Sequence, residues 1–251
     1  MGSPLYAALI ESDPANKCAR VASLAMPLAR TTGEDAQQIP GRPQRPELVH
    51  PARVPHRGLG SAEGRAALIH AVAHIEFNAI NLALDACWRF PEMPEEFHQN
   101  WLSVAQDEAR HFLMLSGRLK ELGYAYGDFV AHNGLWEAAE KTRHDVLVRM
   151  ALVPRVLEAR GLDVTPGMIE RLSSLGDAET VRILRIILEE EVRHVQIGTL
   201  WFRKLCEARG LAPAATFTQL LMDYNMRLRL PLNHAARKAA GFEIEELASA
   251  S

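Results

Sequence analysis

Two short motifs in the sequence place an acid and a histidine three residues apart. Glu108 precedes His111 in the segment DEARH, and Glu191 precedes His194 in the segment EEVRH. Positions three apart on an α-helix lie about 60° apart around the axis and about 4.5 Å along it, so both side chains point to one side. A carboxylate and an imidazole placed in this way can bind one metal ion. A single Glu-x-x-His is weakly specific, because a solvated acid beside a chance histidine has the same pattern.

The acids also repeat along the chain. Glu76 lies 32 residues before Glu108, and Glu158 lies 33 residues before Glu191. The chain therefore repeats one unit, a helix with Glu followed by a helix with Glu-x-x-His. One Glu from each of two helices and Glu-x-x-His from each of two others is the ligand set of diiron carboxylate bundles. We predict six metal ligands: Glu76, Glu108, His111, Glu158, Glu191 and His194.

The neighbours of these acids indicate burial. The helix face of Glu76 also carries Val72, Ala73 and Ile80, and Ile187 lies one turn before Glu191. A carboxylate that faces a core is costly unless it is paired, hydrogen-bonded or bound to metal. Two divalent ions match four carboxylate charges, and a mixed oxygen and imidazole set suits iron or manganese better than zinc. The predicted cofactor is two iron ions, with manganese or a mixed manganese and iron pair as the alternative.

Two further acids, Asp107 and Glu190, directly precede ligand acids. Either could accept a hydrogen bond from the outer imidazole N–H of a ligand histidine on another helix, as acids behind metal ligands commonly do. A surface position is an equal alternative for both. We predict no catalytic residue beyond the metal ligands themselves.

Glycine, proline and capping residues divide the chain into elements. The first half is predicted to contain a helix over residues 4–30, an extended proline-rich strap over 40–55, helices over 61–89 and 94–122, and a loop over 123–133. A helix over 134–160 follows, which is kinked at Pro154 and stopped by Gly161, and then a short helix that starts at Thr165 and Pro166. The last predicted elements are a long helix from Asp177 to near Gly210 and helical pieces from Pro213 to near Gly241. No segment has the alternating pattern of a strand. Four helices of roughly 27 to 33 residues suit a helical bundle.

The composition is that of a globular protein. The 251 residues are 48% hydrophobic and 24% charged, with a net charge of -3, which excludes intrinsic disorder and does not favour nucleic-acid or membrane binding. We find no apolar run near the roughly 18 residues that span a bilayer and no signal peptide at the N-terminus. The three cysteines, Cys18, Cys87 and Cys206, are widely spaced and fit reduced thiols. The predicted location is the cytoplasm.

The arrangement of ligands resembles the ferritin-like diiron superfamily. More narrowly, HAVAHIEFNAINLALDACWRF, DEARHFLMLSGRLKELGYAYGDF and EEEVRHVQIGTLWF are similar to a family of uncharacterised bacterial ferritin-like proteins, which is related to the tRNA-modifying diiron hydroxylase that acts on a prenylated adenosine. The resemblance covers about residues 40–242 and leaves out 1–39. It implies an all-α fold, a ferritin-like four-helix bundle with extra N- and C-terminal helices. The expected domains are residues 1–60 (helix and strap), 61–212 (bundle) and 213–251 (C-terminal helical extension).

The ligand pattern favours an oxygen-activating enzyme that carries out a two-electron oxidation, such as a hydroxylation, of an unidentified substrate. The alternatives are a ferroxidase or iron-binding protein and a non-catalytic, metal-stabilised binding module. A radical-generating reductase subunit is disfavoured, because Leu115 stands where those enzymes carry a tyrosine. The expected partners are a small-molecule substrate or a modified tRNA nucleoside, together with a reductase and a second copy of the chain, and no membrane.

Overall fold

The computed structural model describes residues 2–28, 36 and 39–248. These residues are mainly helical, and the only β pairing among them is an isolated parallel bridge between Leu48 and Ala131. The expectation of an all-α chain is therefore confirmed. The chain forms two compact units, residues 1–136 and 137–251. The three predicted domains are not tested by this division and stay a prediction.

The first unit begins with two short helices, α1 (Pro4–Leu9) and α2 (Pro14–Ser23). The prediction of one helix over residues 4–30 is wrong, and its last two residues lie outside the described ones. Asp13 accounts for the break, because its carboxylate accepts a hydrogen bond from the Asn16 backbone N–H at 2.8 Å and caps a new helix. Pro14 then occupies the first turn, where its missing N–H costs nothing.

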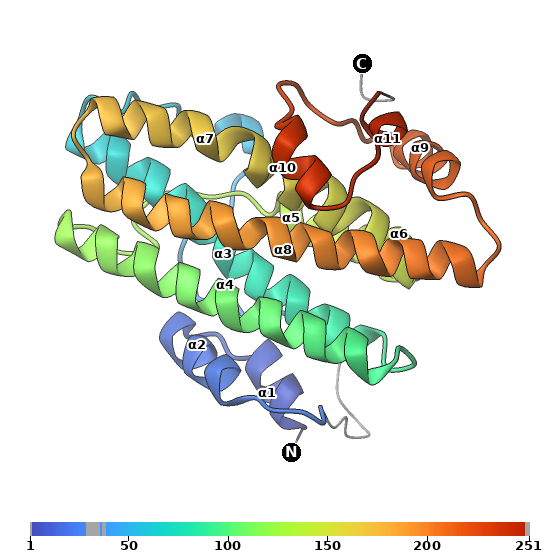
Figure 1. Cartoon of the computed structure of the whole chain (residues 1–251). Helices are drawn as coiled ribbons and strands as arrows, with labels where there is room; N and C mark the ends of the chain where they lie inside the picture. Colours follow the sequence, from blue (N-terminus) through green and yellow to red (C-terminus); the bar gives the residue numbers. More distant parts are fainter. Residues whose placement is uncertain (1, 29–35, 37–38, 249–251) are drawn as a thin grey trace. The chain divides into compact units, whose positions relative to one another are not determined.

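The centre of the first unit is a pair of long helices, α3 (Ala62–Arg89) and α4 (Glu95–Glu121), which pack along their length (Figure 1). The Ser61 hydroxyl caps α3 by accepting a hydrogen bond from the Gly64 N–H at 3.0 Å. Gly123 follows α4 with φ +81°, which suits a helix stop. Both helices are confirmed to within two residues. They place Glu76 on α3 and Glu108 and His111 on α4.

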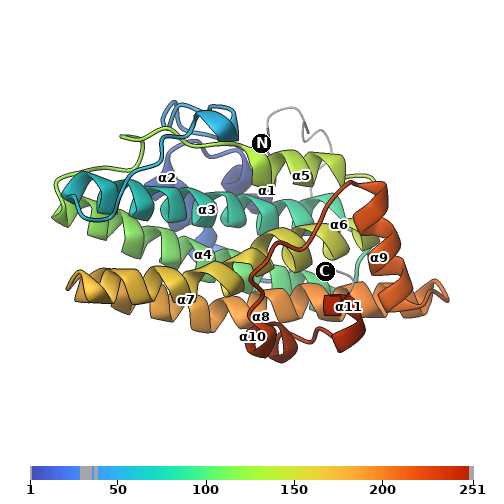
Figure 2. The same cartoon turned by 90° about the horizontal axis from the view of Figure 1, so that it is seen from above.

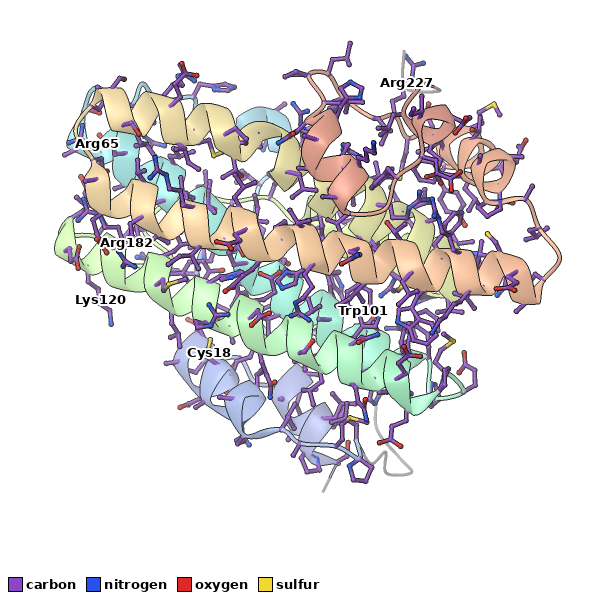
Figure 3. All side chains as sticks on the ribbon, viewed as in Figure 1. Cys18, Arg65, Trp101, Lys120, Arg182 and Arg227 are labelled. Atoms are coloured by element: carbon purple, nitrogen blue, oxygen red, sulfur yellow. The ribbon has the colours of Figure 1, made fainter. Side chains whose placement is uncertain are left out.

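A buried lysine ties the short helices to α3. The Lys17 ammonium on α2 donates to the carbonyl oxygens of Ala8 and Leu9 and to Oδ1 of Asn81 on α3, at 2.9–3.1 Å and 2.8 Å respectively. These three acceptors match the three donors of an ammonium group. Burial lowers the pKa of Lys17 to about 7. Cys18 is buried on the same helix (Figure 3), and all three cysteines are buried free thiols, as predicted.

The proline-rich strap is extended where it is described, apart from one short 3-10 turn at η2 (Pro51–Arg53). It runs beside the loop after α4, where the Val49 N–H donates to the Ala131 carbonyl at 2.8 Å and the Ala131 N–H donates to the Glu47 carbonyl at 3.0 Å. The strap therefore covers the 123–133 loop within the first unit.

One helix among the described residues, α3, is long and apolar enough to cross a membrane by length and composition alone. This differs from the expectation that no apolar run approaches that length. Since 78% of the relevant window is buried, α3 has the character of a core helix, and such helices pass the same test. The observation is weak support for a membrane span.

The second unit carries the largest departures from prediction. The single helix expected over residues 134–160 is replaced by α5 (Gly134–Lys141), which begins in the first unit, by α6 (Val146–Leu152), by a π-helical segment η3 (Val153–Glu158) and by α7 (Ala159–Ser174). Asp145 starts α6, because its carboxylate accepts from the Leu147 N–H at 2.7 Å. Pro154 lies in the first turn of the π-helical segment, and the predicted kink at this proline stays a prediction.

The helix continues past both residues that were expected to interrupt it. Gly161 does not stop α7, and the Thr165 and Pro166 pair does not start a new helix, because Pro166 lies inside α7. Pro166 has no N–H to offer the Leu162 carbonyl four residues earlier. That carbonyl accepts a hydrogen bond from the Asn233 side chain at 3.1 Å, so a tertiary contact replaces the lost helical bond.

The second unit is completed by α8 (Ala178–Ala208), α9 (Pro213–Asp223), α10 (His234–Ala239) and α11 (Ile244–Ala248). Asp177 caps α8 and Gly210 follows it with φ +64°, as expected. The helix α7 packs along α8, and α10 contacts both of them (Figure 2). These contacts bring the C-terminal residues against the helices that carry Glu158, Glu191 and His194.

Candidate metal centre

The structure brings together three of the six predicted ligands in the first unit. Glu76, Glu108 and His111, the first half-site, are all buried. His111 Nδ1 lies 3.3 Å from Oε2 of Glu76 and 3.3 Å from Oε2 of Glu108. One ligand atom from each of the three residues lies within 4.8 Å of the others. Two carboxylates and one imidazole at this spacing could hold a metal ion.

Burial and close negative charges shift the pKa values of the first half-site. Burial raises the pKa of Glu76 well above its usual value of 4.5, and the charge of Glu108 raises it further. Burial alone would lower the pKa of His111, but hydrogen bonds and charges from Glu108 and Glu76 outweigh it and raise this pKa to about 11. His111 therefore holds its proton at neutral pH, and the burial of Glu76 beside Glu108 favours neutralisation of these acids by a proton or a cation.

Two residues that adjoin ligands of the first half-site in the sequence belong to an aromatic cluster. Phe77 follows Glu76 and Phe112 follows His111, and their ring centroids lie 5.5 Å apart. Tyr126, from the loop after α4, meets Phe77 at 5.6 Å and Phe112 edge-on at 4.9 Å. The three rings form an aromatic wall between α3, α4 and the loop that follows α4.

A hydrogen-bond network lies behind that wall. His74 Nε2 lies 3.2 Å from the His132 carbonyl oxygen and 3.1 Å from Asn78 Nδ2, and His74 Nδ1 lies 2.8 Å from the Tyr126 hydroxyl. Burial lowers the pKa of His74 to about 4, so this imidazole is neutral. The sequence offered only one signal for this network, the placement of Asn78 four residues after His74, and none for Tyr126, because it lies in a loop.

The second unit holds the other three predicted ligands, Glu158, Glu191 and His194, which we call the second half-site. Glu191 and His194 are one turn apart on α8, both are buried, and His194 Nδ1 lies 3.3 Å from Glu191 Oε2. This is the same local geometry as in Glu108 and His111. Glu158 is the last residue of the π-helical segment η3 and is partly exposed.

Two close contacts determine how Glu158 faces α8. A Cβ atom added to Gly198 would lie 2.4 Å from the Pro154 ring, and a Cβ atom added to Gly161 would lie 3.8 Å from Glu191 Cγ. Pro154 therefore lies opposite Gly198, and Gly161 lies opposite Glu191. In this antiparallel register position 158 falls opposite His194. The packed neighbouring helix supplies the second acid of the first half-site, whereas among the described residues Glu158 does not join Glu191 and His194 in a group of ligand atoms that lie within 4.8 Å of one another.

The two acids predicted behind the ligands lie nearer to the surface. Asp107 is partly exposed and accepts a hydrogen bond at 2.7 Å from Arg110, one turn further along α4. Glu190 is also partly exposed. The roles expected of Asp107 and Glu190 behind the ligand histidines stay predictions.

Comparison with known proteins adds a family but no activity. A family described as "Protein of unknown function (DUF455)" matches residues 10–248. The match begins well before residue 40, so the expectation that residues 1–39 lie outside the family is wrong for most of that segment. A protein of Haemophilus influenzae named "Uncharacterized protein" is 50% identical over 213 residues, which cover 82% of this chain and 74% of that protein. No solved structure matches the chain significantly.

Proposed function

The chain belongs to the DUF455 family of proteins of unknown function, and we propose that it is a diiron carboxylate oxidoreductase. It would activate dioxygen for a two-electron oxidation, such as a hydroxylation, of a substrate that is not yet identified. The proposal includes the ferritin-like assignment, because the ligand repeat is the one that such bundles use. The single observation that carries it is the buried group of Glu76, Glu108 and His111.

The donor set supports iron as the metal. The six residues supply four carboxylates and two imidazoles and no thiolate, a combination suited to iron or manganese. Glu76 and Glu108 are both buried within one small group, and two buried acids of this kind are costly unless protons or cations neutralise them. Two divalent ions would replace the retained protons and balance the four acids. We therefore propose that the first and second half-sites each supply the ligands of one iron ion.

The chain's own residues have three roles in this proposal. Glu76, Glu108, Glu158 and Glu191, with His111 and His194, hold and orient the metals, which when reduced supply the chemistry of dioxygen activation. The ring wall of Phe77, Phe112 and Tyr126 excludes water from the acids and keeps the local dielectric low. His111 would release its proton when a metal binds.

Metal analysis tests the proposal directly. The chain would be loaded anaerobically with excess ferrous iron, freed of unbound ions by gel filtration, and measured for iron per chain. We expect about two ions, and a folded preparation that retains none, or only zinc at a remote site, would overturn the proposal.

Oxygen uptake separates an enzyme from an iron store. Aerobic addition of a large excess of ferrous iron should leave the retained iron near two ions per chain, since an oxygenase without substrate and reductant reacts about once per site. Accumulation of hundreds of irons per assembly would show mineral storage instead and would overturn the oxidoreductase.

A further inference from the structure

The stretch that carries Glu158 has an irregular backbone. Pro154 lies at the start of the π-helical segment η3, and Pro166 lies inside α7. A proline removes one backbone donor, and π-helical turns change which residues face a neighbouring helix. Local hydrogen bonding therefore does not determine the direction of the Glu158 side chain by itself, and tertiary contacts must contribute.

The C-terminal residues supply those contacts on the far side of Glu158. Asn233 donates from its side chain to the Leu162 carbonyl at 3.1 Å and from its backbone N–H to Asp163 Oδ1 at 2.9 Å. Arg237 forms a two-pronged ion pair with Asp163, with Nε to Oδ1 at 2.9 Å and Nη2 to Oδ2 at 2.8 Å. Both partners of this pair are buried, and such bidentate pairs fix orientation as well as distance.

The same segment also contacts the chain on the near side of Glu158. Arg237 Nη1 donates to the Arg155 carbonyl at 3.4 Å. One guanidinium from α10 therefore bridges positions 155 and 163, which lie three residues before and five residues after Glu158. A shift of the backbone at Glu158 would have to break one end of this bridge.

The Arg155 side chain forms a second and deeper anchor. Its guanidinium is fully buried and donates to Glu246 Oε1 of α11 at 2.5 Å. It also lies 4.4 Å from the ring centroid of Phe202, 4.2 Å from that of Phe217 and 4.6 Å from that of Phe242. Burial lowers the pKa of Arg155 to about 10, so the group is still charged at neutral pH. Three separate parts of the second unit thus enclose one cation.

We propose that Arg155, Arg237 and Glu246 are positioning residues, through which the C-terminal segment 233–246 holds Glu158 opposite His194 for metal binding. This inference rests on the proposed metal function of the second half-site. It assigns to α10 and α11 a role in the metal site although neither helix supplies a ligand.

A role in positioning explains the burial of these charges better than stability alone does. Desolvation of a buried ion pair cancels much of its attraction, and apolar residues of similar size often stabilise a fold as well or better. A buried pair such as Arg155 and Glu246 does, however, impose one geometry on the segments that carry it. Residues behind metal ligands commonly change metal affinity about 10–100-fold when they are replaced.

The test is a titration of Glu246→Gln with manganese(II), in which the free ion is followed by electron paramagnetic resonance. In a Glu76→Ala background the titration reports the second half-site, and there we expect the affinity to fall about 10–100-fold. In a Glu158→Ala background it reports the first half-site, and the affinity should not change. Glu245→Gln, at the exposed neighbouring position, is the matched control and should bind like the parent in both backgrounds.

A second variant guards against a simple loss of folding. Arg155→Met combined with Glu246→Leu removes the ion pair but keeps apolar volume, so it should stay folded and still bind manganese weakly at the second half-site. Wild-type affinity at that half-site, in either Glu246→Gln or a folded double variant, would overturn the inference.

Hydrogen exchange in the metal-free protein separates the two proposals. Amides of residues 155–163 should exchange faster in Glu246→Gln than in Glu245→Gln, because the backbone there loses an anchor. Unchanged exchange would overturn the positioning role. A wild-type chain that binds no metal would overturn the proposed function instead, and the exchange experiment would still decide whether the C-terminal segment holds this backbone.

Discussion

A single added methyl group at Gly198 should disturb the second half-site. In Gly198→Ala the new Cβ would lie 2.4 Å from Cβ and Cγ of Pro154, about 1 Å closer than the 3.4 Å at which ordinary contact begins. Neither partner is a flexible chain end, since one is a helix backbone and the other a proline ring. The π-helical segment η3 must therefore move away from α8, and Glu158 moves with it.

The cost of the contact between the added Cβ and Pro154 can be separated from the stabilisation that any change from glycine to alanine brings to a helix. Replacing a helical glycine by alanine normally stabilises by about 0.5–1 kcal/mol, whereas overpacking a core costs about 1–3 kcal/mol. Gly167 lies in α7 of the same unit and has nothing within 4 Å of its added Cβ. Gly167→Ala should therefore show only the stabilisation that comes from replacing a helical glycine. We expect Gly198→Ala to be less stable than Gly167→Ala by about 1–3 kcal/mol.

Two measurements check this prediction. Urea unfolding gives the stability difference between the two variants, and the manganese titration gives ion retention at each half-site. Gly198→Ala should lose affinity at the second half-site and keep it at the first, while Gly167→Ala should bind like wild type. Equal stability together with equal ion retention in both variants would show that the contact between Gly198 and Pro154 does not determine the position of Glu158.

Three further predictions follow from the half-sites and their surroundings. The variants Glu76→Ala and Glu158→Ala should each retain about one metal ion per chain instead of two, with their helical content preserved. The control is Glu121→Ala, at an exposed position, which should retain two ions. Elemental analysis measures the metal content, and circular dichroism measures the helical content. The pKa of Glu76 is raised and that of His111 is raised to about 11, so a binding metal ion must displace protons. The apparent metal affinity should therefore rise with pH between about 6 and 8, and calorimetry should detect proton release. A metal affinity that does not depend on pH would contradict this prediction. Tyr126→Phe leaves His74 Nδ1 without its 2.8 Å partner and should lower the unfolding free energy by about 1–3 kcal/mol, with metal retention unchanged.

Features that depend on neighbours along the chain could be predicted from the residue order alone. Ser61 and Asp177 as caps, and Gly123 and Gly210 as stops, act within about one turn of helix, so α3, α4 and α8 could be predicted to within two residues. The Glu-x-x-His turns follow the same rule, because residues three apart share a helix face whatever surrounds them. The repeat of the acids at 32 and 33 residues indicated which carboxylates belong with those turns.

The backbone around Glu158 depends on contacts that could not be predicted from the sequence. Sequence reasoning treated Pro154 as a kink and Pro166 as a helix start, since a proline lacks a donor that its own helix needs. In the fold, packing against Gly198 accompanies a π-helical segment, and Asn233 satisfies the Leu162 carbonyl from 71 residues away. The burial of Arg155 beside Glu246 could not be predicted from the sequence either, because a charge is stable in a core only when distant residues supply its partners. Local spacing therefore predicts the ligand types, whereas residues distant in the sequence contact the backbone on both sides of Glu158.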